Sequence, residues 1–250
     1  MAESARKVTV VTGGGRGIGA AVCRRLAADG HDLALTWVSD GAAAESVAAE
    51  VRASGVRCLT VRADTSVPED VEELFDRAVA ELGPLTGLVN NAGVTGPLGR
   101  LTATRVEDLR RVVDVNLLGT LLCCRRAALE FGAGGRGGAI VNLSSGAATL
   151  GSPGEFVHYA ASKAAVDTLT MGLAKELGPE GVRVNAVAPG LVDTDMHAAM
   201  GAPDRAERMA PGIPLRRAGE PSEIAAAVAW LLSEESSYTT GAVLRVAGGR

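Results

Sequence analysis

Short apolar runs alternate with longer helical segments along the chain, and this alternation restricts the possible folds more than any other feature. A first strand is predicted at 7–12, and it leads through several glycines into a helix over 18–30. Strands that alternate with helices of this length require crossover connections, which make parallel sheets with helices on both faces. The sequence therefore predicts an α/β fold with a doubly wound parallel sheet.

The rest of the chain repeats the same unit. Further strands are predicted at 32–38, 56–64, 86–93, 138–145, 182–190 and 242–248, and further helices at 41–55, 68–83, 105–131, 157–177 and 221–232. No Pro/Ser-rich linker interrupts the pattern, and the glycine-rich stretch 132–138 is too short to separate domains. A chain of 250 residues is of ordinary size for one α/β domain, so we expect a single domain over 1–250.

Composition and charge narrow the classes of function. The net charge of −4 gives no general attraction to nucleic acid or anionic membranes. No apolar run reaches the ~20 residues that span a bilayer, and the first residues lack the apolar segment of a secretion signal. We therefore expect a cytoplasmic protein whose partners include neither nucleic acid nor a membrane.

The four cysteines and three histidines show no metal-binding pattern. There is no C-x-x-C motif, and the spacings match no common metal site. The cysteines are predicted to be small buried side chains in a reducing compartment, with no metal: Cys23, Cys58, Cys123 and Cys124.

The segment "TGGGRGIG" (12–19) connects the first strand to the first helix. Glycines permit a tight turn and let the backbone approach a pyrophosphate, whose charge the helix N-terminus stabilises. A plain strand–helix turn is the alternative. The position of the segment, at the first crossover of a parallel sheet, favours a dinucleotide site and a Rossmann-like fold.

The glycine spacing and four later motifs together resemble one family. Gly13, Gly17 and Gly19 fit T-G-x-x-x-G-x-G instead of G-x-G-x-x-G. The later motifs follow in the family's order: "NNAG" at 90–93, "VNLLG" at 115–119, "SSGAA" with "YAASK" at 144–163, and "APG" at 188–190. The chain thus resembles the classical short-chain dehydrogenase/reductase family over nearly its whole length. Its nearest members are bacterial oxidoreductases of unassigned substrate and 3-oxoacyl-[acyl-carrier-protein] reductases.

This resemblance implies an NADP-dependent oxidoreductase that transfers a hydride between the cofactor and a ketone or secondary alcohol. It also implies a homotetramer and a substrate lid at about 191–215. A 3-oxoacyl-[acyl-carrier-protein] reductase is the alternative, for which Arg125, Arg126 and Arg136 are available to bind an acidic carrier. A non-catalytic nucleotide-binding regulator is disfavoured, because it would be expected to lack Tyr159 or Lys163.

The choice between NAD and NADP depends on the end of the second strand. An acid there would bond the ribose 2′-hydroxyl and repel a 2′-phosphate. The family's acidic position falls on Trp37, while Arg16 could supply a cation and Ser39 a hydroxyl. NADP is therefore expected. Asp40, three residues past the acidic position, leaves NAD possible.

The resemblance also assigns the remaining cofactor contacts. Asp64 is expected at the adenine ring, although it could instead cap the strand end, and Thr194 is expected at the nicotinamide carboxamide. Asn90 is expected to link strands. The full expected set is Gly13, Gly15, Arg16, Gly17, Ile18, Gly19, Trp37, Ser39, Asp64, Asn91, Ala92, Gly93, Tyr159, Lys163, Pro189, Gly190, Val192 and Thr194.

Tyr159 and Lys163 stand four residues apart, on one face of the helix predicted at 157–177. The resemblance implies that the tyrosine is the general acid/base. Lowering a phenol pKa from about 10 to about 7 requires roughly 4 kcal/mol. A positive charge at ~4 Å, in an effective dielectric of ~20, supplies about 4 kcal/mol. Lys163 is therefore expected to lower the pKa of Tyr159 by its charge.

Two further catalytic residues are implied, Ser145 and Asn116. Side chains alternate along a strand, so only one of Ser144 and Ser145 can face the site, and the family pattern selects Ser145. One extra residue in the loop 151–158 leaves the shape of the substrate side open. The histidines His31, His158 and His197 are expected to be non-catalytic, although His197 lies in the expected lid.

Overall fold

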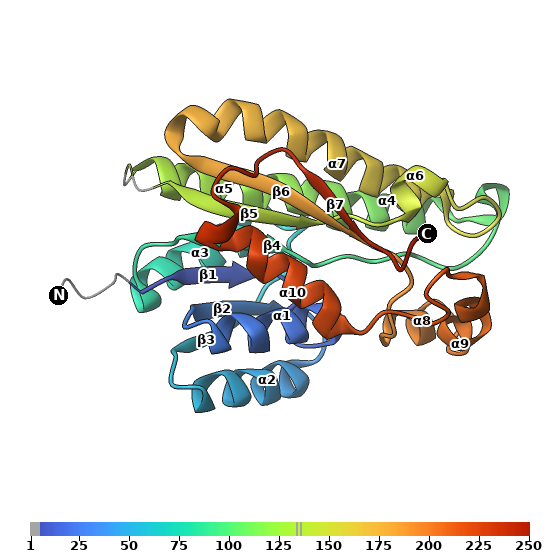
Figure 1. The fold of residues 1–250 in the computed structure, drawn as a ribbon, viewed down its shortest axis with the longest axis horizontal. Helices are drawn as coiled ribbons and strands as arrows, with labels where there is room; N and C mark the ends of the chain where they lie inside the picture. The colour runs from blue at the N-terminus through green and yellow to red at the C-terminus, as the bar shows by residue number, and fades with distance from the viewer. Residues whose placement is uncertain (1–5, 134, 136) are drawn as a thin grey trace.

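A computed structural model describes residues 6–133, 135 and 137–250, and it contains a seven-stranded sheet (Figure 1). Neighbouring strands are all parallel, and their order is β3-β2-β1-β4-β5-β6-β7. The order reverses between β1 and β4, and α/β sheets bind ligands beside such a reversal, at the carboxyl ends of the strands. The strands are Val8–Val11 (β1), Asp32–Trp37 (β2), Cys58–Arg62 (β3), Gly87–Asn90 (β4), Gly138–Leu143 (β5), Val182–Pro189 (β6) and Val243–Val246 (β7).

Helices cover both faces of this sheet (Figure 1). One face carries α1 (Gly17–Ala28), α2 (Gly41–Ala53) and α10 (Pro221–Leu232). The other face carries α3 (Pro68–Leu82), α5 (Gly119–Ala133) and α7 (Val157–Leu177). The predicted doubly wound α/β architecture is confirmed.

Strands β1 to β6 each contribute to two hydrophobic cores, one on each side of the sheet. Val10 and Leu88 pack with α3 and α5, whereas their neighbours Val11 and Val89 pack with α1 and α10. Successive side chains point to opposite faces of a strand, so a strand covered on both faces needs apolar residues at every position. This requirement explains the uninterrupted apolar runs in the sequence.

The long helical stretch predicted at about 105–131 is present, but it contains a π-helical turn. An α-helix α4 (Val106–Val113) passes into this turn over Asp114–Leu118, and α5 follows directly. The Thr120 hydroxyl of α5 donates to the main-chain oxygen of Asn116 in the turn at 2.8 Å. The apolar periodicity of the sequence does not reveal a single widened turn of this kind.

Three short helices were not predicted, namely α6 (Ala147–Leu150), α8 (Met196–Ala199) and α9 (Arg205–Met209). Helices of four or five residues leave little periodicity in a sequence. Helices α8 and α9 lie together at the carboxyl end of the sheet (Figure 1). The described residues contain no helix long and apolar enough to cross a membrane.

Candidate active site

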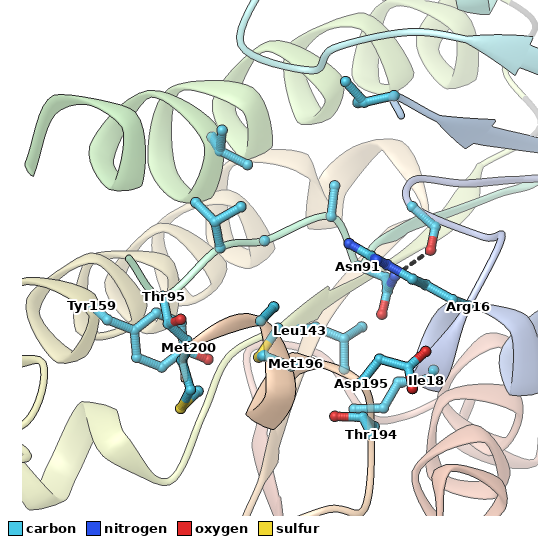
Figure 2. Close-up of a pocket in the computed structure, with 18 of the residues that line it drawn as sticks. Arg16, Ile18, Asn91, Thr95, Leu143, Tyr159, Thr194, Asp195, Met196 and Met200 are labelled. Atoms are coloured by element: carbon cyan, nitrogen blue, oxygen red, sulfur yellow. Dashed lines mark hydrogen bonds between the residues drawn. The ribbon is translucent and has the colours of Figure 1, made fainter. Parts of the chain in front are cut away.

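A cleft of about 990 Å³ opens at the carboxyl ends of the central strands, where the strand order reverses. Of the predicted cofactor residues, all but Gly19 line this cleft, and so does Ser145. Asn116 and Gly19 lie behind its wall. Arg16 and Ile18 of the glycine turn lie at one end of the cleft, with Tyr159 and Met200 at the other (Figure 2).

The glycine turn is held rigidly between three strands. Gly13, at φ +65°, donates its N–H to the Thr36 hydroxyl at 3.0 Å. The Asn91 amide donates to the main-chain oxygens of Thr12 and Gly13 at 2.9 and 3.0 Å. A Cβ atom at Gly19 would lie 2.2 Å from the Gly13 oxygen. Gly19 is therefore required by packing beneath the turn, whereas Asn91 both lines the cleft and positions the turn.

The start of α1 fits an anionic group. Within the part of the chain that the structure describes, no side chain caps this helix, whose N-cap residue is Arg16. Its first N–H groups therefore remain available to donate hydrogen bonds to an anion such as a pyrophosphate. The glycine turn and the helix start together fit the phosphates of a dinucleotide.

The end of β2 holds an aromatic ring where an acid would select NAD. Trp37 packs on Gly41, where a Cβ atom would lie 2.8 Å from the ring, and the Arg62 guanidinium stands 6.0 Å from the ring centroid. The Asp40 carboxylate accepts the Ala43 N–H at 2.9 Å and so caps α2. The Asp40 carboxylate is thereby engaged in capping α2.

Asp64 caps the end of β3. Its carboxylate accepts the N–H and the hydroxyl of Ser66 at 3.0 and 2.7 Å and pairs with Arg111 at 2.8 Å. Burial acts to raise the pKa of Asp64, but these partners outweigh it and hold the pKa below its ordinary value. The capping role considered from the sequence is therefore present, and the carboxylate also lines the cleft.

Ser145 and Tyr159 meet at the inner end of the cleft. Both side chains line the cleft, and Ser145 acts to lower the pKa of the buried phenol, while burial has the larger effect and raises it. Ser144 also borders the cleft, but its hydroxyl donates to the main-chain oxygen of Lys163 at 3.4 Å. Of the two adjacent serines, Ser145 is the one beside the tyrosine.

Lys163 is buried and bonded to the strand behind it. Its ammonium donates to the main-chain oxygen of Leu143 at 2.7 Å and stands 5.8 Å from the centroid of the Tyr159 ring. Burial lowers the pKa of Lys163 to about 8, opposed by the charge of Asp167. The expected lowering of the Tyr159 pKa by Lys163 is not found. Desolvation of the phenol dominates, and the influences on Tyr159 are burial and Ser145.

Asn116 joins three elements behind the cleft. Its Oδ1 accepts the Val94 N–H at 2.8 Å, and its Nδ2 donates to the Val94 oxygen at 2.9 Å and to the Ser162 hydroxyl at 3.0 Å. A Cβ atom at Gly93 would lie 3.3 Å from Asn116 Oδ1 and 3.4 Å from Lys163 Nζ. The Asn116 side chain therefore fixes the loop after β4 against α7, within a few ångströms of the lysine.

The other predicted polar residues have structural partners. Asn90 donates to Asn142 at 2.9 Å and so links β4 to β5, as expected. His158 and His197 donate through Nε2 to the oxygens of Thr95 and Val192, at 3.0 and 2.8 Å. His31 bonds the Thr9 hydroxyl at 2.9 Å. The four cysteines are buried and unpaired, and the described part of the chain contains no cluster able to hold a metal ion.

A second cavity of about 400 Å³ adjoins Ser145 and Tyr159 on the side away from the glycine turn. Its wall comes from α6, the loop 151–156, α8 and α9, and Met196 and Met200 of α8 and its end lie close to Tyr159 (Figure 2). The sequence directed attention to the loop 151–158 and to 191–215, which contribute to this wall, but it singled out none of the side chains below, because short helices and loops carry no motif. Its main side chains are Leu150, Glu155, Phe156, Met196, Met200 and Arg205.

Comparisons with known proteins agree with this geometry. A family model described as "Enoyl-(Acyl carrier protein) reductase" matches residues 13–250. The chain is 42% identical to the "Uncharacterized oxidoreductase YgfF" of Escherichia coli, over 97% of this chain and 99% of that one. The chain belongs to the short-chain dehydrogenase/reductase family. It is accordingly an NAD(P)-dependent oxidoreductase.

Two further proteins are similar to this chain over nearly their whole length. The cis-4-hydroxycyclohexanecarboxylate dehydrogenase of Sinomonas cyclohexanicum is 42% identical, over 98% of this chain and 96% of that protein. A blue fluorescent protein from a metagenomic library, solved in complex with NADPH, superposes with a TM-score of 0.89 at 38% identity, over 97% of both chains.

Proposed function

We propose that this protein is an NADP-dependent oxidoreductase that interconverts a ketone and a secondary alcohol, with Tyr159 as general acid/base. The observation that carries the proposal is the position of Ser145 and Tyr159, which line both the cofactor cleft and the second cavity and so lie at their junction. A substrate carbonyl at this junction would meet both hydroxyls. The bound cofactor supplies the hydride.

Each side chain has a distinct part in this proposal. Because burial raises its pKa, Tyr159 keeps its proton at neutral pH and can donate it to the carbonyl oxygen as the alcohol forms. Ser145 orients the same oxygen by a hydrogen bond. Lys163 holds a positive charge below about pH 8 and binds the nicotinamide ribose, while Asn116 fixes the loop beside it.

The preference for NADP is supported by the residues around the end of β2. Trp37 stands where an acid would repel the 2′-phosphate, Asp40 caps α2, and Arg16 is an exposed cation on the cleft wall. We expect wild-type protein to bind NADPH more tightly than NADH. Arg16→Ala should weaken NADPH by about tenfold, the value of a charge-assisted contact, and leave NADH nearly unchanged.

This preference is measured by fluorescence titration of both reduced cofactors. Arg62→Ala is the matched control, because Arg62 does not line the cleft, although its guanidinium stands 6.0 Å from the ring centroid of the same tryptophan. Equal or tighter binding of NADH by the wild type would contradict the proposal and would direct attention to Asp40.

A 3-oxoacyl-[acyl-carrier-protein] reductase is the second candidate, and the charges of α5 do not favour it. Arg126 pairs with Asp76, Glu72 and Glu130, and Arg125 pairs with Glu72 at 3.6 Å. These acidic partners reduce the positive field that an acidic carrier would need. Arg136 lies outside the described residues.

We propose further that residues 191–215 form a substrate lid on a single domain, and that the protein is a homotetramer. Helices α4 and α5 support the tetramer, because they expose large apolar side chains that an interface would cover. The exposed apolar residues are Val106, Val113, Leu118, Leu121 and Leu129. Light scattering of the purified protein measures the mass of the assembly.

A screen of carbonyl compounds tests the proposed function. Purified protein with NADPH is mixed with cyclic and short-chain ketones and with acetoacetyl-coenzyme A, and the absorbance of the reduced cofactor is followed. The relative named for a hydroxycyclohexane acid supports the inclusion of cyclic substrates. We expect turnover of simple ketones. Turnover of the thioester alone would favour the carrier-protein candidate.

A further inference from the structure

A half-buried ion pair lines the substrate cavity. The two terminal nitrogens of the Arg205 guanidinium contact the two oxygens of Glu155, each at 2.7 Å. The Arg205 side chain is only 7% exposed, although it belongs to the short helix α9, and its partner Glu155 is 38% exposed. In the similar Arg217–Glu223 fork the arginine is exposed as well, with side chains 53% and 41% exposed. A fork of this kind fixes geometry, because both planar groups must align.

The pair connects the proposed lid to the wall of the active site. Glu155 belongs to the loop before α7, and its main-chain oxygen accepts the Gly99 N–H at 2.7 Å. Arg205 belongs to the 191–215 segment. The loop that presents Glu155 is tightly turned, because Ser152 takes φ +45° and its oxygen accepts the N–H groups of Glu155 and Phe156, both at 3.3 Å.

The same arginine reaches Tyr159 through one aromatic ring. The Arg205 guanidinium stands 5.4 Å from the centroid of Phe156. Phe156 meets the Tyr159 ring edge-to-face, with centroids 5.4 Å apart and planes at 89°. Met200 of the same segment packs into this apolar cluster. Contacts through Phe156 therefore connect α9 and the end of the cavity to the Tyr159 ring.

The pair also determines what the cavity can hold. Because Glu155 and Arg205 satisfy each other, the cavity offers a substrate the apolar surfaces of Leu150, Phe156 and Met200 beside the Ser145–Tyr159 pair. The polar side chains of His197 and Arg250 complete the lining. A volume of about 400 Å³ suits a compact molecule, and a long chain would extend beyond it toward α9 and the ion pair.

We infer that Glu155 and Arg205 form a latch that holds α9 over the cavity and restricts the substrate to compact ketones or secondary alcohols with an apolar body. The inference rests on the proposed function, because it concerns the substrate of that site. Both residues are positioning residues that act through the lid and Phe156.

The test compares ketones of different length in latch variants. The variants are Glu155→Gln, which keeps the shape of the side chain, and Arg205→Lys, which keeps the charge but not the fork. The matched control is Asp204→Asn, which removes the exposed partner of Arg208 on the same helix. Kinetics with butanone, cyclohexanone and 2-decanone are measured with saturating NADPH, at a temperature where thermal unfolding shows every variant folded.

We expect the wild type and Asp204→Asn to prefer the compact ketones. In both latch variants the ratio of kcat/KM for 2-decanone to that for cyclohexanone should rise by about tenfold, mainly through KM, while the Kd of NADPH stays within about twofold. A structural role alone would lower activity without changing this ratio. An unchanged ratio in both variants, or a wild type that prefers 2-decanone, would overturn the inference.

Hydrogen exchange provides a readout independent of turnover. Peptides covering 196–209 should exchange faster in both latch variants than in the wild type or Asp204→Asn, whereas peptides from α1 and β4 should not change. If the peptides covering 196–209 exchange equally fast in the latch variants and in the wild type, the inference is overturned. If the wild type reduces no ketone, the proposed function fails, and the exchange measurement still decides whether Glu155 and Arg205 hold α9.

Discussion

Replacement of Tyr159 by Phe is expected to lower kcat for ketone reduction by about 10²- to 10⁴-fold, the usual contribution of a positioned acid. Phenylalanine keeps the ring and its edge-to-face contact with Phe156, so the change removes only the hydroxyl. The Kd of NADPH should change little. Steady-state kinetics with a ketone from the screen, together with fluorescence titration of the cofactor, measure both quantities.

The chain offers a matched control for this substitution. Tyr238 is the only other tyrosine, and it is fully exposed, so Tyr238→Phe should keep wild-type kinetics. Retention of more than about a tenth of the wild-type kcat by Tyr159→Phe would contradict the proposed role, because a positioned acid contributes at least about a hundredfold.

Replacement of Lys163 by Met is expected to lower kcat/KM by at least about a hundredfold and to weaken NADPH binding, because it removes the buried cation. It should also change the pH profile. With a pKa of about 8, Lys163 carries its charge well below pH 8 and loses it as the pH rises through that value. Ketone reduction by the wild type should therefore decline above about pH 8.

The decline of activity with rising pH distinguishes titration of Lys163 from titration of Tyr159. Burial raises the pKa of Tyr159, so the phenol keeps its proton across this range, and the decline reports the lysine alone. The decline should be absent in Lys163→Met and present in Lys175→Met, a control at an exposed lysine on the same helix. Persistence of the decline in Lys163→Met would contradict the assignment.

Much of the fold could be predicted from the sequence, because local patterns determine it. The bounds of α7 and α10 agree with the prediction over 157–177 and 221–232, where apolar residues recur at helical spacing up to Gly178 and Ser233. The π turn at 114–118 could not be predicted in this way. It depends on tertiary contacts, including the close approach of Gly119 to Thr65, where a Cβ atom would lie 2.7 Å from the hydroxyl.

The candidate site, like the fold, could be predicted from the sequence only in part. Motif spacing identified the residues that line the cleft, but it could not give the sign of the Tyr159 pKa shift, which depends mainly on how deeply the phenol is buried. Glu155 and Arg205 were missed for a similar reason. They stand fifty residues apart in a loop and a short helix, and only the folded chain brings them together.

The central claim is that this site transfers a hydride to a ketone carbon while Tyr159 protonates the oxygen. The most direct measurement uses NADPH deuterated at the transferred position, incubated with a ketone and either wild type or Tyr159→Phe, with mass spectrometry of the alcohol. We expect one deuterium on the carbinol carbon with the wild type, and almost no labelled alcohol with Tyr159→Phe. Unlabelled alcohol from the wild type, or labelled alcohol formed equally fast by the variant, would contradict the account.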